Sequence, residues 1–373
     1  MKKIKIMSVF GTRPEAIKMA PVVKALEADD AFESIVCVTA QHREMLDQVL
    51  ELFEIKPDYD LDIMQHGQTL SDITCRVLKG LESVIQEVKP DMVLVHGDTS
   101  TTLAASLASF YNHTKVGHVE AGLRSFDLYS PFPEELNRSL TGRIANLHFS
   151  PTKSNVDNLL REGMAQDTIY QVGNTVIDAL IKVIKPDYTF EDDSLNLIDY
   201  ENRKVLLLTA HRRENLGESM CNIFSAVRRI INEFPETELI FPMHKNPKIR
   251  ELADTYLSGS DRIHLIEPLE YEAFANIMAK SDIILTDSGG IQEEAPALGK
   301  PVLVLRKETE RPEAVEAGTV LLAGVEEETI FEMTAKLLRD SAEYDKMANA
   351  INPYGDGKTS ERITTILKKY FGQ

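Results

Sequence analysis

The chain has 373 residues, of which 43% are hydrophobic and 27% are charged, and its formal net charge is −18. This length predicts two domains rather than one core, and the acidity without any basic run argues against nucleic acid as a partner. No apolar run approaches the roughly 18 residues of a membrane span, and Arg13 comes too early for a signal peptide, so we expect a cytoplasmic protein that does not enter a membrane.

Short apolar runs alternate with amphipathic stretches along the first half of the chain. We predict helices over residues 15–28 and 70–88, placed between apolar runs that read as strands. The predicted strands cover residues 5–10, 35–39, 92–95, 116–119 and 147–149. Strands that alternate with helices in this way predict a parallel sheet with helices on both faces.

A second series of the same kind follows. Its predicted strands cover residues 205–209, 238–241, 263–266, 282–286, 301–305 and 320–322. Residues 185–203 are polar and predict a loop or a weak helix. We therefore predict an α/β protein of two Rossmann-like parallel-sheet domains, residues 1–172 and 173–357, facing a central cleft. Apolar residues at helical spacing predict a C-terminal helix within residues 358–373 that can pack back on the first domain.

The segment after the predicted strand 282–286 resembles a phosphate-binding turn. Ser288, Gly289 and Gly290 follow the strand and precede a predicted helix. Glycines let the backbone approach an anion closely, and the N-terminus of a helix carries partial positive charge. One turn later, Glu294 could accept hydrogen bonds from ribose hydroxyls. In so acidic a chain, such local donors must hold an anionic ligand against the overall field.

Charged groups follow several other predicted strands. Arg13 and Lys18 lie near the start of the first helix, and Asp98, Glu120 and His211 each come just after a strand. Ligands bind beyond the carboxyl ends of parallel strands, so these positions are candidates for function. Each residue alone is more typical of a cap or a surface pair. Together they predict a binding site in a cleft between the domains.

Seven segments together resemble the non-hydrolysing UDP-N-acetylglucosamine 2-epimerases of bacteria. They are residues 10–18, 96–99, 117–124, 133–138, 209–215, 286–295 and 310–313. The resemblance implies a glycosyltransferase-B architecture, a homodimer, and interconversion of UDP-GlcNAc with UDP-ManNAc for cell-surface polysaccharide synthesis.

The same resemblance implies roles for individual residues. The implied catalytic residues are Asp98, Glu120, Glu134, Arg138 and His211. The implied contacts of the UDP-sugar are Arg13, Lys18, Phe274, Ser288, Gly289, Gly290, Glu294 and Arg311. Without the resemblance, the helical spacing around Phe274 favours a core residue, and Lys18 is equally typical of an exposed helix lysine.

The chemistry limits the route that such a reaction can take. The proton on C2 of the sugar has no neighbouring carbonyl to make it acidic, and the chain has no NAD-binding fingerprint that would supply a transient ketone. Elimination of UDP to 2-acetamidoglucal, followed by re-addition, is the path that the family implies. We expect neither a cofactor nor a metal, because no His or Cys cluster has ligand spacing.

Other functions fit parts of the same pattern. A glycosyltransferase or a hydrolysing 2-epimerase could use the same nucleotide-binding turn. A sensor that binds a sugar nucleotide without turnover is a further alternative, but Asp98, Glu120 and Glu134 would hinder binding of a diphosphate without serving it. The three carboxylates therefore favour an enzyme.

Some bacterial members of the family are activated by a second UDP-GlcNAc, which the resemblance places near Gln41, His42 and Gln68. Members with that site tend to carry Gln where this chain has Glu44 and Arg where it has Gly67. The chain therefore lacks a cation there and adds a carboxylate that repels phosphate. We hypothesise that this activation is weakened or absent.

Overall fold

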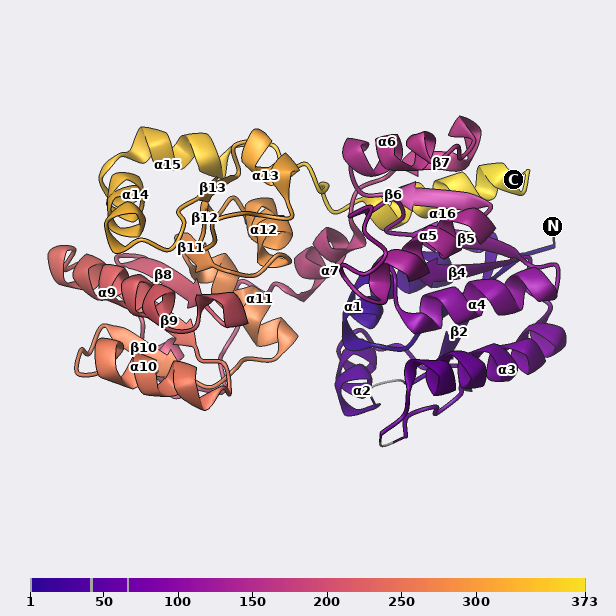
Figure 1. The fold of residues 1–373 in the computed structure, drawn as a ribbon, viewed down its shortest axis with the longest axis horizontal. Helices are drawn as coiled ribbons and strands as arrows, with labels where there is room; N and C mark the ends of the chain where they lie inside the picture. The colour runs from indigo at the N-terminus through magenta and orange to yellow at the C-terminus, as the bar shows by residue number, and fades with distance from the viewer. Residues whose placement is uncertain (1, 41–42, 66, 373) are drawn as a thin grey trace. The chain divides into compact units, whose positions relative to one another are not determined.

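The computed structural model describes residues 2–40, 43–65 and 67–372. It divides into two compact units, one formed by Met1–Ala179 with Tyr354–Gln373 and the other by Leu180–Pro353 (Figure 1). We call them the first unit and the second unit. Among the described residues, no helix combines the length and the apolar character that crossing a membrane requires.

The described residues of the first unit form a parallel seven-stranded sheet in the order β3-β2-β1-β4-β5-β6-β7. Its strands are β1 (Ile4–Phe10), β2 (Phe32–Val38), β3 (Tyr59–Asp60), β4 (Met92–His96), β5 (Lys115–Val119), β6 (Leu147–Ser150) and β7 (Ile169–Gln171). Its helices are α1 (Arg13–Glu27), α2 (Arg43–Leu52), α3 (Leu70–Val88), α4 (Ser100–Tyr111), α5 (Glu134–Ile144), α6 (Lys153–Arg161) and α16 (Thr359–Tyr370), with a 3-10 turn η1 (Gln166–Thr168). Helix α7 (Thr175–Val183) begins in this unit and ends in the next.

Helices cover the sheet of the first unit because its strands are apolar on both sides. Val77 and Leu81 of α3 are fully buried and pack in one cluster with Val93 and Val95 of β4. The residue between these two, Leu94, is fully buried as well, so the strand has no face turned to water. This is the pattern of a central strand in a parallel sheet.

The second unit repeats the arrangement with a six-stranded parallel sheet in the order β10-β9-β8-β11-β12-β13. Its strands are β8 (Lys204–Thr209), β9 (Thr237–Pro242), β10 (Ile263–Ile266), β11 (Ile283–Thr286), β12 (Val302–Val304) and β13 (Val320–Leu322). Its helices are α8 (Asp193–Asn196), α9 (Glu218–Glu233), α10 (Pro247–Leu257), α11 (Tyr271–Lys280), α12 (Ile291–Glu294), α13 (Pro312–Glu316), α14 (Glu327–Arg339) and α15 (Ser341–Ala348), with 3-10 turns η2 (Arg213–Asn215) and η3 (Ala295–Leu298). Two Rossmann-like parallel-sheet domains are thus confirmed.

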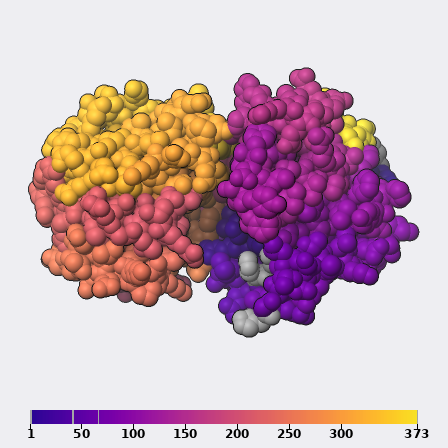
Figure 2. Space-filling view, viewed as in Figure 1, coloured from indigo at the N-terminus to yellow at the C-terminus, as the bar shows by residue number. Residues whose placement is uncertain are grey.

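The C-terminal helix α16 packs on the first unit, where it contacts α1. The buried carboxylate of Asp178 accepts hydrogen bonds from the backbone N–H groups of Thr359 and Ser360, at 3.2 and 2.7 Å. Ile363 and Leu367 on its inner face are fully buried. Figure 2 shows part of this segment, in yellow, among the magenta and indigo atoms of the first unit. The first unit comprises residues up to 179 and from 354, where the sequence predicts residues 1–172 and a C-terminal helix within 358–373 that can pack back on them.

Two edge strands of the first sheet, β3 and β7, are absent from the sequence prediction. They contain two and three residues, which is too short for an alternating pattern to be visible. In the polar segment 185–203, helix α8 has four residues, as a loop or weak helix predicts.

Candidate functional site

Each sheet has a switch point, where neighbouring strands send their connections to opposite sides. In the first unit this point lies between β1 and β4, and in the second unit it lies between β8 and β11. Ligands of open parallel sheets bind at such points, beyond the carboxyl ends of the strands. The loops that begin there carry Arg13 and Asp98 in the first unit, and His211 and Ser288 in the second.

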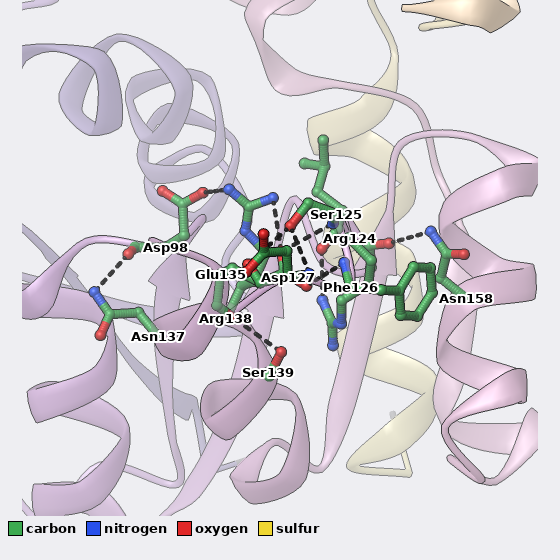
Figure 3. A network of polar contacts seen from close by, with 12 residues as sticks. Asp98, Arg124, Ser125, Phe126, Asp127, Glu135, Asn137, Arg138, Ser139 and Asn158 are labelled. Carbon is green, nitrogen blue, oxygen red and sulfur yellow. Dashed lines mark hydrogen bonds and ion pairs between the residues drawn. The ribbon is translucent and has the colours of Figure 1, made fainter. Parts of the chain in front are cut away.

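Asp98 is held by helix α5 in the first unit. Its Oδ2 accepts a hydrogen bond of 2.6 Å from Nη2 of Arg138, and its backbone carbonyl accepts one of 2.9 Å from the amide of Asn137 (Figure 3). Burial raises the pKa of Asp98; the Arg138 guanidinium opposes this rise, and the carboxylates of Glu120 and Glu134 add to it. A carboxyl that keeps its proton more readily than usual is suited to general acid–base chemistry.

Glu120 lies just after β5 and has a strained backbone, with φ of 62° in the left-handed region. Its carboxylate forms an ion pair with Lys18 and accepts a hydrogen bond of 3.0 Å from Asn174. The ring nitrogen Nε2 of buried His96 lies 3.7 Å from the same carboxylate oxygen. A non-glycine residue in this conformation costs about 1–2 kcal/mol, so surrounding contacts must hold it there. The structure thus brings Lys18 to a predicted catalytic carboxylate.

Glu134 and Arg13 occupy the first residues of their helices. Glu134 begins α5 and is half-buried, and Arg13 begins α1 and is also half-buried. Arg138 lies one turn after Glu134, with its side chain directed to Asp98. The structure therefore groups Lys18, Asp98, Glu120, Glu134 and Arg138 around the ends of β4 and β5, and places Arg13 after the neighbouring strand β1.

Two buried carboxylates near these residues, Glu135 and Glu15, are absent from the predicted site. Glu135 accepts hydrogen bonds of 3.0 Å from the backbone N–H groups of Ser125 and Phe126, and it lies 3.4 Å from Nη1 of Arg138. Figure 3 shows it next to the Asp98–Arg138 pair. Glu15 is the second, and burial raises its pKa although the hydroxyls and amides around it oppose that rise. The sequence signal that could have found Glu135 is its place beside Glu134 in one motif.

The hydrogen bonds to Glu15 connect two of the loops that leave the sheet. It accepts bonds of 3.1 and 2.8 Å from the backbone N–H groups of Gly11 and Thr12, and one of 2.6 Å from the hydroxyl of Thr99. The loop after β1 is thereby tied to the loop after β4. The positions of Arg13 and Asp98 at the switch point depend on this link.

A cavity of about 380 Å³ opens at the carboxyl ends of the strands in the second unit. It is lined by Thr209, Ala210, His211, Pro242, His244, Lys245, Pro268, Leu269, Phe274, Ser288 and Ile291. Three predicted residues, His211, Phe274 and Ser288, thus share one cavity. Phe274 lines this cavity, whereas the helical spacing of the apolar residues around it favours a place in the hydrophobic core. His244 and Lys245 are absent from the prediction although they also follow a predicted strand.

The turn after β11 keeps an open surface at its two glycines. A Cβ atom at Gly290 would have no heavy atom within 4 Å, and one at Gly289 would have a single neighbour, Arg212, at 3.9 Å. The helix that follows differs from the expectation. Helix α12 has four residues and passes directly into the 3-10 turn η3, so fewer aligned peptide dipoles add positive charge here than in a long helix.

Glu294 and Arg311 lie on or against α12 and do not line the cavity. The carboxylate of Glu294 is 3.4 Å from the hydroxyl of Tyr271, one turn before Phe274 on α11. Arg311 forms an ion pair with Glu293, which is buried. The structure therefore brings both predicted residues to the short helix that follows the glycine turn.

The residues of the suggested regulatory site are described only in part. Gln41 and His42 lie outside the described residues. Gln68 accepts a hydrogen bond of 3.2 Å from Nη1 of Arg76, which also donates to the carbonyl of Ile63. Glu44 is exposed in the first turn of α2. The hypothesis of weakened activation stays a prediction.

Comparison with known proteins decides the family. Residues 24–368 match the family described as UDP-N-acetylglucosamine 2-epimerase. The chain belongs to this family. The UDP-N-acetylglucosamine 2-epimerase of Bacillus subtilis is 57% identical over 373 residues, covering 100% of this chain and 97% of that protein. Membership of the UDP-N-acetylglucosamine 2-epimerase family places the chain among the isomerases and confirms the resemblance.

Two solved members of the family have the same fold. A crystal structure of a UDP-N-acetylglucosamine 2-epimerase has a TM-score of 0.93 at 55% identity and covers 100% of this chain and 97% of its own. The UDP-GlcNAc 2-epimerase of Neisseria meningitidis, solved bound to UDP-GlcNAc, has a TM-score of 0.84 at 52% identity. It covers 98% of this chain and 100% of its own. These likenesses agree with the glycosyltransferase-B class that the sequence predicts.

Proposed function

We propose that this chain interconverts UDP-N-acetylglucosamine and UDP-N-acetylmannosamine by inverting C2 of the sugar. The observation that carries the proposal is the full-length likeness to the Neisseria enzyme bound to UDP-GlcNAc, at 52% identity. Three carboxylates of the first unit, Asp98 and Glu120 after strands and Glu134 at the start of α5, give the chain groups that can move protons. A protein that only binds sugar nucleotides has no use for them.

The reaction that we propose is an anti elimination followed by re-addition. The C2 proton leaves to a carboxylate while the bond between C1 and the diphosphate oxygen breaks, and the bonding electrons of that C–O bond leave with UDP. The product held on the enzyme is 2-acetamidoglucal. UDP then adds back to C1, and C2 takes a proton from the opposite face. The scheme uses no cofactor and no metal.

Different groups serve the proton transfers and the leaving nucleotide. We assign the proton transfers to Asp98, Glu120 and Glu134, and the raised pKa of Asp98 supports it as a proton donor. Arg138 pairs with Asp98, so it controls the position and charge of that carboxyl. Arg13 and Lys18 are the cations of the first unit that we assign to the UDP-sugar.

We assign UDP itself mainly to the second unit. Phe274 serves uracil and Glu294 serves ribose. His211, Ser288 and Arg311 serve the diphosphate, together with the backbone N–H groups of Gly289 and Gly290. Donors aimed at a leaving group stabilise the charge that develops on it, which lowers the barrier to elimination. The proposed reaction requires both sets of groups to reach one sugar nucleotide.

The exchange of hydrogen at C2 tests this proposal. Incubation with UDP-GlcNAc in D₂O, followed by proton NMR, should show UDP-ManNAc with deuterium at C2 and little free UDP. ManNAc with stoichiometric UDP would indicate a hydrolase, and inertness without an acceptor would indicate a transferase or a sensor. The Asp98→Asn variant is the control. It should still bind UDP, and its rate of deuterium incorporation should be at least about 10²-fold below that of the wild-type protein.

Three further expectations belong to the same proposal. The product would supply N-acetylmannosamine units for cell-surface polysaccharides. Residence in the cytoplasm and assembly as a homodimer stay predictions.

A further inference from the structure

The carboxylate of Asp287 connects the two strands at the switch point of the second unit. Asp287 follows β11 and is fully buried. Its Oδ2 accepts three hydrogen bonds, from the backbone N–H groups of His211 and Arg212 at 2.9 and 2.8 Å and from the amide of Asn215 at 3.1 Å. These bonds fix the start of the loop after β8.

The second oxygen of this carboxylate faces the ring of His211. Oδ1 is buried and lies 3.1 Å from Nδ1 of His211. No hydrogen bond with regular geometry from the described residues reaches Oδ1, so the His211 ring is the group placed to satisfy it. Burial raises the pKa of Asp287, but the nearby His211 side chain and the hydrogen bonds from the Arg212 and His211 N–H groups outweigh burial and lower it overall. An ionised carboxylate only accepts hydrogen bonds, so a proton on Nδ1 is the arrangement that suits this contact.

We propose that Asp287 is a positioning residue that fixes the tautomer of His211, with the proton on Nδ1 and the lone pair on Nε2. A neutral imidazole has one donor and one acceptor nitrogen, and the hydrogen bond to one nitrogen decides the state of the other. His211 lines the cavity of the second unit. Its Nε2 is therefore the nitrogen available to a ligand there.

The consequence for the reaction rests on the proposed function. When Nε2 takes up a proton, Asp287 balances the charge of the imidazolium, and Nε2–H can donate a hydrogen bond to the leaving diphosphate. The opposite tautomer presents Asp287 with an unprotonated Nδ1, so two acceptors would face each other. Asp287 thus lets one ring bind the nucleotide and stabilise its departure.

Replacing Asp287 by asparagine distinguishes its effect on the His211 tautomer from its support of the loop after β8. In Asp287→Asn, the amide oxygen suits the three donors that now bond Oδ2, which leaves the amide NH₂ at the place of Oδ1. The NH₂ group donates to Nδ1, so the ring proton moves to Nε2. We expect turnover to fall by about 10²-fold or more, while the dissociation constant of UDP changes less than about tenfold.

The test is NMR of the full-length protein labelled with ¹⁵N-histidine, with His211→Gln used to assign the ring signals. The wild-type protein should show His211 with the proton on Nδ1, and Asp287→Asn should show it on Nε2. Asn215→Ala is the matched control, because it removes another donor from the same carboxylate and leaves the ring contact in place. It should lower the melting temperature and keep both the wild-type tautomer and turnover.

A wild-type proton on Nε2, or wild-type turnover in Asp287→Asn, would overturn the inference. If Asp287→Asn does not fold, the spectrum of the wild-type protein decides. The tautomer is read in the resting protein, so this result is separate from the proposed function, whose failure would appear as a wild-type protein that does not epimerise.

Discussion

At two places in the chain, one of two adjacent glutamates is buried and pairs with an arginine, whereas the other has a different partner or is partly exposed. Glu134 is half-buried at the start of α5, whereas the next residue, Glu135, is buried and holds Arg138. On α12, Glu294 contacts Tyr271, whereas Glu293 is buried and holds Arg311. Neighbouring residues on a helix point about 100° apart, so one carboxylate can face a ligand while the other faces the protein.

Glu134→Gln and Glu135→Gln should separate these roles. In Glu135→Gln, one oxygen that accepts a hydrogen bond from the backbone N–H of Ser125 or Phe126 becomes an NH₂ group, so this partly buried donor loses its partner. The free energy of unfolding should fall by about 1–3 kcal/mol, as measured by urea denaturation. Glu134→Gln should change it by less than about 0.5 kcal/mol and abolish most turnover. Equal losses of stability would contradict this division.

The sequence shows that these glutamates are adjacent, but it does not show which of the two is buried. Asp98, Glu120 and His211 were predictable because each follows an apolar strand, where a charged residue is conspicuous. Asp287 also follows an apolar strand, and Glu15 stands three residues after Thr12 as in a capping box. Their contacts with Thr99 and with His211 join residues 84 and 76 positions apart, and no spacing rule reports such contacts. These long-range contacts therefore became visible only in the structure.

At the scale of elements, strands β4 and β5 each carry a buried histidine. Burial lowers the pKa of His96 to about 4 and that of His118 to about 3. Nε2 of His118 lies 2.7 Å from the carbonyl of Gly97, so it must donate to that oxygen. Both rings are thus neutral in the folded protein at pH 7, because burial disfavours the charged, protonated form of a histidine.

These histidines should make the first unit sensitive to acid. The unfolded ring binds a proton near pH 6.5 and folded His96 only near pH 4, so unfolding takes up a proton between these values. The free energy of unfolding should therefore fall as the pH drops from 6.5 to 4, by on the order of 3 kcal/mol for His96 alone. Above pH 6.5 the free energy of unfolding should not depend on the protonation of His96.

Urea denaturation at several pH values checks the sign. His118→Asn can still donate to the carbonyl of Gly97 and should flatten the loss of stability below pH 6.5. His113→Asn is the control, because His113 is exposed and has a φ of 54° that asparagine tolerates. If the His118 and His113 variants lose stability with the same slope, the buried ring is not the cause.

Helix α16 should contribute strongly to the first unit. Ile363→Ala removes a fully buried side chain and should lower the free energy of unfolding by about 2–5 kcal/mol. Ile351→Ala changes the same residue type at a position that is 87% exposed, so we expect a change below about 0.5 kcal/mol. Calorimetry of both variants measures the difference. A small effect of Ile363→Ala would mean that α16 packs loosely in solution.

The regular elements were largely predictable from sequence. Continuous apolar runs such as residues 92–95 indicate strands buried on both faces, and residues 70–88 show the spacing of an amphipathic helix. The edge strands β3 and β7 were not predictable, because two or three residues contain no period. The short α12 was not predictable either, since Pro296 and Gly299 shape its end together with the local packing.

At the scale of the whole molecule, the homodimer is a prediction that one measurement can check. Several large apolar side chains of the first unit are exposed, among them Tyr129 at 81% and Phe132 at 59%, and the two rings stack. Exposed apolar groups of this kind favour association. Light scattering after size exclusion should give twice the chain mass of 41.9 kDa. A mass equal to one chain at micromolar concentration would contradict the dimer.

The first unit is built from both ends of the chain, and this has a consequence for biosynthesis. Residues 1–179 leave the ribosome before the second unit, but α16 emerges after it. At about 5–20 residues per second, the nascent protein waits on the order of 10 to 40 seconds with the surface of α1 that α16 will cover still open to water. The first unit is thus completed only after the second unit has been translated, and in that interval its apolar surface under α16 can associate with other chains.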